Sequence, residues 1–86
     1  MDLREYRKQI DSIDDELLRL FKERMEVSQQ IAQFKKENGL PVLDAAREKD
    51  KLDVIGEKAG EVFCSYAQTL YKTLFELSRA YQESTI

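Results

Sequence analysis

The sequence predicts an all-α fold of three helices, one of them very long. Of its 86 residues, 42% are hydrophobic and 36% are charged, with three glycines and one proline. That composition suits long amphipathic helices better than strands. Apolar residues also recur at steps of three and four, which is the period of one helical face. A chain of this length is expected to form one domain, over residues 1–86.

The first helix is expected at about 2–38. Its apolar stripe consists of Leu3, Tyr6, Ile10, Ile13, Leu17, Leu20, Val27, Ile31 and Phe34. Asn38-Gly39 is typical of a left-handed helix end, and Pro41 blocks continuation. At 1.5 Å per residue such a helix is about 55 Å long, whereas a compact chain of this size has a radius of gyration of about 12 Å. The stripe must therefore pack on another protein or a second copy, most simply as a two-fold homodimer.

Two shorter helices are expected after this turn. Asp44 is a good N-cap for a helix at about 44–57, after which Gly56 and Gly60 are expected to loosen the chain. A second apolar stripe with the same period predicts a third helix at about 61–83.

Composition and charge exclude several classes of function. The net charge is -3 and no basic block is present, so nucleic acid is not an expected partner. No apolar run suits a membrane span or a signal peptide, and the lone Cys64 fits a reducing cytoplasm, so a cytoplasmic protein without membrane contact is expected. The absence of histidine excludes a Ser-His-Asp triad, a Cys-His pair and a typical zinc site.

Cationic residues interrupt the apolar stripe of the first helix. Arg24 occupies an apolar position between Leu20 and Val27, and a buried arginine needs a partner. Lys35 follows eleven residues later, about 20° around the helix, so the two cations share a face and together could hold an anion. Arg7 is turned about 100° from Arg24, so a two-fold partner could deliver it to the same pocket. Each cation alone is also explained by exposure to solvent.

Polar residues also gather on the two shorter helices. Asp44, Arg47 and Glu48 share one face, although Asp44 can be a simple cap and the other two an ordinary surface pair. Ser78 and Gln82 prolong the Ala67-Tyr71-Leu74 face of the third helix, so this apolar stripe ends in two neutral hydrogen-bonding groups. Such polar ends of a stripe are also common without a function.

Taken in order, these residues resemble the AroQ class of chorismate mutases. The pattern is Arg7, Ile10, Ile13-Asp14, Leu17-Leu18, Glu23-Arg24, Lys35, Pro41-Val42-x-Asp44-x2-Arg47-Glu48 and Ser78-x3-Gln82. It covers nearly the whole chain, and the Asp-x2-Arg-Glu segment after the Pro-Val turn is fairly specific. The resemblance implies one chorismate mutase domain, in an intertwined all-helical homodimer with two equal active sites.

The resemblance also implies which groups act on chorismate. Arg24 and Lys35 of one chain and Arg7 of the second chain would bind its two carboxylates. Lys35 and Gln82 would donate to the ether oxygen, whose bond breaks in the reaction.

The remaining polar residues would hold the ring and shape the pocket. Glu48, helped by Asp44, would accept the ring hydroxyl and completes the expected catalytic set with Lys35, Gln82 and Arg24. Ser78 would approach a carboxylate, and Arg47 would line the pocket and orient its neighbours.

The implied activity is the intramolecular [3,3] rearrangement of chorismate to prephenate, a step of phenylalanine and tyrosine biosynthesis in the shikimate pathway. The ether C–O bond breaks while a C–C bond forms, so no proton transfer and no nucleophile is needed, and no cofactor or metal is expected. Two alternatives stay open, namely an isochorismate pyruvate-lyase with the same fold and cationic pocket, and a non-catalytic regulatory helical dimer module.

Overall fold

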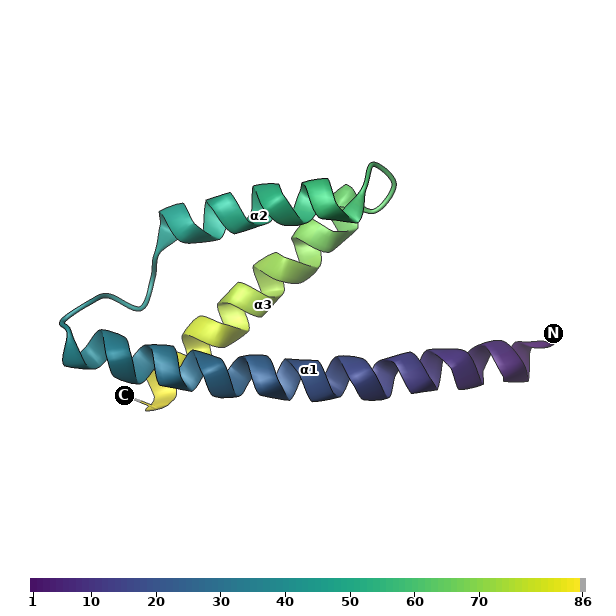
Figure 1. The fold of residues 1–86 in the computed structure, drawn as a ribbon, viewed down its shortest axis with the longest axis horizontal. Coiled ribbons are helices and arrows are strands. Elements are labelled where there is room, and N and C mark those ends of the chain that lie inside the picture. Colours follow the sequence, from purple (N-terminus) through teal and green to yellow (C-terminus); the bar gives the residue numbers. More distant parts are fainter. Residues whose placement is uncertain (86) are drawn as a thin grey trace.

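The computed structural model describes residues 1–85 and the side chains of residues 1–84. Over that range the chain forms three helices and no strand: α1 (Leu3–Glu37), α2 (Ala45–Ala59) and α3 (Cys64–Thr85). The predicted all-α class is confirmed. Figure 1 shows α1 and α2 as the two sides of the molecule, with α3 crossing obliquely from the end of α2 to the C-terminal half of α1.

Both ends of α1 are capped. The Asp2 side chain accepts a hydrogen bond from the Glu5 N–H at 3.0 Å, which satisfies one of the free donors of the first turn. At the other end Gly39 has a φ of 65°, and the Leu40 N–H donates to the Lys35 carbonyl at 2.8 Å. A left-handed residue with this bond closes a helix, so the chain turns toward α2 where its Asn-Gly sequence indicates.

The second helix continues through Gly56 to Ala59, so the expectation that Gly56 loosens the chain is wrong. Gly56 is buried, and a Cβ atom there would lie 2.6 Å from Gln68 Nε2 and 2.9 Å from Cys64 Sγ. The glycine thus allows α3 to approach α2 closely. The helix ends at Gly60, the other glycine expected to loosen the chain, whose φ is 84°.

The third helix begins at Cys64, whereas the apolar stripe alone placed its start at about 61. Residues 61–63 form a turn, in which the Phe63 N–H donates to the Gly60 carbonyl at 3.2 Å. This bond reverses the chain after α2, and the regular helix starts only when that reversal is complete.

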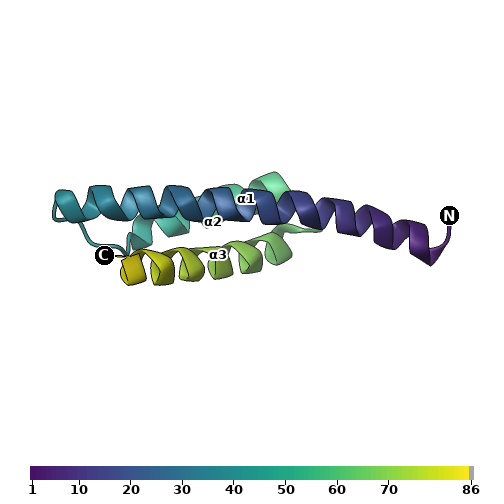
Figure 2. The same cartoon turned by 90° about the horizontal axis from the view of Figure 1, so that it is seen from below.

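The three helices enclose little apolar core. Helix α3 packs on both α1 and α2, which do not pack on each other, and the buried hydrophobic residues of the described chain are Ala32 and Phe75. The molecule measures 54 × 27 × 15 Å with a radius of gyration of 15.9 Å, against about 12 Å for a compact chain of this length. In Figure 2 the N-terminal half of α1 projects beyond the other two helices.

The apolar stripe of α1 is largely uncovered in the single chain. Ile10, Ile13 and Leu17 each expose 55% of their surface, which is costly for large apolar side chains in a row. No helix in residues 1–85 has the length and apolar character needed to cross a membrane.

Candidate active site

Seven of the eight site residues predicted from the sequence line one cleft of about 680 Å³ between the three helices. The volume lies within the usual range of small-molecule sites, about 300–1,000 Å³. Helix α1 supplies two of the seven residues, the start of α2 with its cap supplies three, and α3 supplies two. In chain order they are Arg24, Lys35, Asp44, Arg47, Glu48, Ser78 and Gln82.

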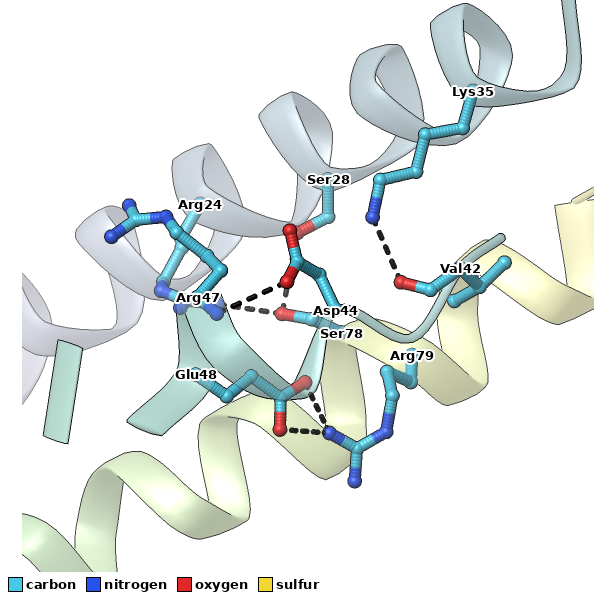
Figure 3. A network of polar contacts seen from close by, with 9 residues as sticks. All are labelled: Arg24, Ser28, Lys35, Val42, Asp44, Arg47, Glu48, Ser78 and Arg79. Carbon is cyan, nitrogen blue, oxygen red and sulfur yellow. Dashed lines mark hydrogen bonds and ion pairs between the residues drawn. The ribbon is translucent and has the colours of Figure 1, made fainter. Parts of the chain in front are cut away.

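Arg24 is the cation that interrupts the apolar stripe of α1, and its partner lies on α3 (Figure 3). Its Nη1 donates to Ser78 Oγ at 2.5 Å, and its guanidinium lies 5.8 Å from the centre of the Phe75 ring. The ring face attracts the cation. Arg24 is therefore held against α3 by one polar and one aromatic contact, with the rest of its guanidinium donors left for the cleft.

Ser78 is buried, and its hydroxyl receives two hydrogen bonds. Besides Arg24, Ser28 Oγ of α1 donates to Ser78 Oγ at 3.2 Å. A hydroxyl has two acceptor positions and one O–H donor. With both acceptor positions used, the group that Ser78 can offer to a ligand is its O–H.

Lys35 closes the end of the cleft where α1 meets the connection to α2. Its Nζ donates to the Val42 carbonyl at 2.8 Å. An ammonium has three N–H donors, so this bond fixes the direction of the side chain and leaves two donors for a ligand. The Gly39 turn matters here because it brings Val42 back beside the last turn of α1.

Asp44 caps α2, which was one of the two roles left open from the sequence. Its Oδ1 accepts from the Arg47 N–H at 3.0 Å, and the side chain also lines the cleft. The cap fixes the first turn of α2 and hence the direction in which Arg47 and Glu48 leave it. Arg47 is exposed at this rim of the cleft.

Glu48 forms an ion pair with Arg79 of α3, in which Arg79 Nη1 donates to both carboxylate oxygens (Figure 3). The hydrogen bond to Glu48 raises the pKa of the Arg79 guanidinium above its ordinary value. Burial works in the opposite direction, and the charges of Glu48, Glu76 and Glu83 add to the rise. Arg79 is therefore a permanent cation at every pH at which the protein would be studied.

Gln82 lies one helical turn after Ser78 and is as deeply buried, with 6% of its surface exposed. Both side chains line the cleft from the C-terminal part of α3. The polar end of the α3 stripe is thus part of the cleft wall rather than a solvated helix end.

Arg7 is the one predicted site residue that the single chain does not bring to the cleft. It is exposed on the projecting half of α1, seventeen residues before Arg24 and hence about 25 Å away along the helix axis. An arginine side chain cannot span that distance.

Two polar residues that form hydrogen bonds within this site, Ser28 and Arg79, were not predicted from the sequence. Ser28 lies one turn after Arg24 and two turns before Lys35, so its position on the same face was a readable signal. Arg79 directly follows Ser78, but its pairing with Glu48 depends on how α2 and α3 cross. The residues around Arg79 in the sequence do not indicate how these two helices cross.

Within the described residues the cleft is lined by five cations and three carboxylates, a net charge of two positive, although the whole chain carries -3. A cleft of one sign attracts ligands of the opposite sign. In residues 1–85 no group of three or more His, Cys, Asp or Glu side chains could hold a metal ion. The positive charge and the volume of the cleft therefore suit a small dianion.

Comparison with known families matches residues 6–83 to chorismate mutase type II. The chain belongs to the type II chorismate mutase family. Chorismate mutase of Methanocaldococcus jannaschii is 34% identical over 83 residues, which make up 94% of this chain and 84% of that protein. Membership of this family makes the chain an isomerase.

Two longer relatives match part of the chain. The bifunctional chorismate mutase/prephenate dehydratase of Aquifex aeolicus is 37% identical over 62 residues, 72% of this chain and 17% of that protein. The T-protein of Haemophilus influenzae is 39% identical over 61 residues, 67% of this chain and 16% of that protein. The matched segment thus makes up about a sixth of each relative.

Proposed function

We propose that this member of the chorismate mutase family converts chorismate to prephenate in a cleft completed by a second copy of the chain. The observation that carries the proposal is the cationic cleft, with polar groups from all three helices and a net charge opposite to that of the chorismate dianion. The reaction would serve phenylalanine and tyrosine biosynthesis, and the single cysteine fits a reducing cytoplasm.

Substrate binding would fall mainly to cations. Arg24 and Lys35 bind the two carboxylates of chorismate, together with Arg7 from the second chain. The fixed guanidinium of Arg24, backed by Ser78 and Phe75, favours a two-point contact with one carboxylate. The Ser78 O–H reaches toward the same group. These contacts hold the flexible substrate in the compact chair-like shape that the rearrangement requires.

Acceleration of the reaction would come from donors aimed at the ether oxygen. As its C–O bond breaks, negative charge develops on that oxygen, and Lys35 and Gln82 donate to it. Donors fixed before the reaction stabilise such charge more than water does, because they need not reorganise. The contact of Lys35 with the Val42 carbonyl and the burial of Gln82 provide this fixed arrangement.

The other end of the substrate would be held by α2. Glu48 accepts a hydrogen bond from the ring hydroxyl, Asp44 supports Glu48 by fixing the first turn of the helix, and Arg47 covers the rim. None of these groups needs to exchange a proton with the substrate, because the [3,3] rearrangement moves only bonding electrons within one molecule.

The functional unit in this proposal is an intertwined homodimer with two equal sites. Its support is the uncovered stripe of α1, on which Ile10, Ile13 and Leu17 are half exposed, and the elongated shape of the single chain. Two copies crossing through their α1 helices would bury the stripe and bring Arg7 of each to the cleft of the other.

The two alternatives from the sequence receive no separate support. Two of the three relatives named above carry chorismate mutase in their names, and none is named as a lyase. A silent regulatory module would have no need for Arg24, Ser78 and Gln82 around one cleft.

The test is the loss of chorismate absorbance in the ultraviolet with purified protein at neutral pH and no added cofactor. Lys35→Ala and Gln82→Ala should each lower kcat by about two to three decades, the usual cost of losing one fixed donor to a developing anion. Lys36→Ala, which removes the exposed neighbouring cation, should stay within twofold of wild type. Absence of turnover by well-folded wild-type protein, or release of pyruvate from isochorismate, would contradict the proposal.

A further inference from the structure

We infer that Arg79 is a positioning residue for the proposed rearrangement, which holds the Glu48 carboxylate in place to receive the ring hydroxyl and offsets its charge. The inference rests on the proposed function. It assigns a role to a residue that the sequence pattern of the site does not include, and it concerns a contact between two different helices.

The contact has the geometry of a positioning bond. Arg79 Nη1 lies between the two carboxylate oxygens of Glu48, and the two side chains are only 27% and 25% exposed. A carboxylate offers about four acceptor positions, and a single nitrogen between its oxygens occupies the two inner ones. The two outer positions stay free for a hydroxyl donor from the cleft.

Without Arg79, Glu48 would have another cation within reach. Lys51 lies three residues later on α2 and also lines the cleft. Pairing with Lys51 would turn the carboxylate along α2 and away from its present direction. A glutamate near a helix start has several rotamers of similar energy, so a partner on α3 is what selects one of them.

Arg79 also compensates charge. A glutamate carboxylate beside a dianion repels it, and the repulsion is strong where water is partly excluded. Arg79, which also lines the cleft, offsets that charge by pairing with the Glu48 carboxylate from α3. Its loss would lower the net charge of the cleft lining from two positive to one positive, at the wall where no carboxylate-binding cation is proposed.

A purely structural role would look different. If Arg79 only joined α3 to α2, its removal would lower stability and leave the activity of the folded protein unchanged, whatever residue stood at position 48. If it acts through Glu48, the loss of activity depends on that glutamate. A double-mutant cycle measures this dependence directly.

The experiment compares wild type, Arg79→Gln, Glu48→Gln and the double variant by kcat/KM for chorismate. We expect Arg79→Gln to lower kcat/KM about tenfold or more, as for loss of a hydrogen bond to a charged group. In the Glu48→Gln background the same change should cost less than twofold. Arg79→Lys, which keeps the charge, should retain more activity than Arg79→Gln.

The control is Arg19→Gln, which breaks an exposed ion pair with Glu16 on α1 and should leave kcat/KM unchanged. Thermal unfolding by circular dichroism verifies folding, and Arg79→Met, which also removes the charge, carries the cycle if Arg79→Gln does not fold. Activity of Arg79→Gln within twofold of wild type, or an equal loss in both backgrounds, overturns the inference alone. An inactive wild-type protein overturns the proposed function and the inference together.

Discussion

Gln82 decides how the proposed activity depends on pH. As a neutral amide it donates its N–H without having to bind a proton, so wild-type kcat should change less than twofold between pH 5 and pH 8. In Gln82→Glu only the protonated carboxyl can donate, since the ionised form repels the charge that develops on the ether oxygen. Burial raises the pKa of such a carboxyl above the ordinary value of about 4.3, yet above that pKa the protonated fraction falls tenfold per pH unit.

The kcat of Gln82→Glu should therefore fall at least tenfold from pH 5 to pH 8, measured by chorismate absorbance in constant ionic strength buffers. Gln30→Glu, on the exposed surface of α1, is the matched control and should follow wild type. A flat profile for Gln82→Glu would mean that Gln82 does not donate to the reacting oxygen.

At the residue scale, the sequence predicted those site residues that break a local pattern and did not predict those that depend on how the helices cross. Arg24 was recognisable because a cation breaks an apolar stripe, and its contacts with Ser78 and Phe75 supply the partner that burial demands. Arg79 was not recognisable. It lies in an ordinary helical position, and only the crossing of α2 and α3 brings it to Glu48.

At the scale of the elements, local signals define helix ends well where the backbone itself is constrained. The Asp2 cap and the left-handed Gly39 mark the ends of α1, and both are readable from residue types. Gly56 has the same residue type as Gly39 but lies inside a helix. What distinguishes the two glycines is that Gly56 packs against α3. That contact cannot be predicted from the sequence of α2 alone.

The role of Gly56 leads to a stability prediction. In Gly56→Ala the new Cβ would meet Gln68 Nε2 at 2.6 Å, and moving that amide breaks its hydrogen bond to the Leu52 carbonyl. Overpacking of this kind costs about 1–3 kcal/mol, while alanine recovers about 1 kcal/mol of helix propensity. We expect a net loss of about 1 kcal/mol in the free energy of unfolding.

Urea denaturation at one fixed chain concentration measures this loss, because association would otherwise change the apparent stability. Repeating the change in a Gln68→Ala background provides the control, since the clash with the amide is then absent and the cost should shrink. An equal cost in both backgrounds would place the strain elsewhere, at Cys64 or in the backbone.

At the scale of the whole molecule, the single chain exposes a stripe of large apolar side chains along α1. Ile13 is 55% exposed in the middle of the stripe proposed to join two copies. Ile13→Asp should abolish the dimer and with it the activity, because burying a lone carboxylate in an apolar interface is unfavourable. Sedimentation velocity reports the dimer, and Ser12→Asp, which adds the same charge on another face of α1, should leave it intact. A dimeric Ile13→Asp protein would exclude this stripe as the interface.

The strongest test of the shared site uses two inactive variants together. Arg7→Ala and Arg24→Ala each damage both sites of their own homodimer. In a mixed dimer, however, one site receives Arg24 from the first variant and Arg7 from the second and is complete, while the other lacks both. Unfolding and refolding the two variants in equal amounts gives about half mixed dimers, so about a quarter of wild-type activity per chain should return. If Arg7 instead served the cleft of its own chain, each mixed site would still lack one arginine, and mixing would restore nothing.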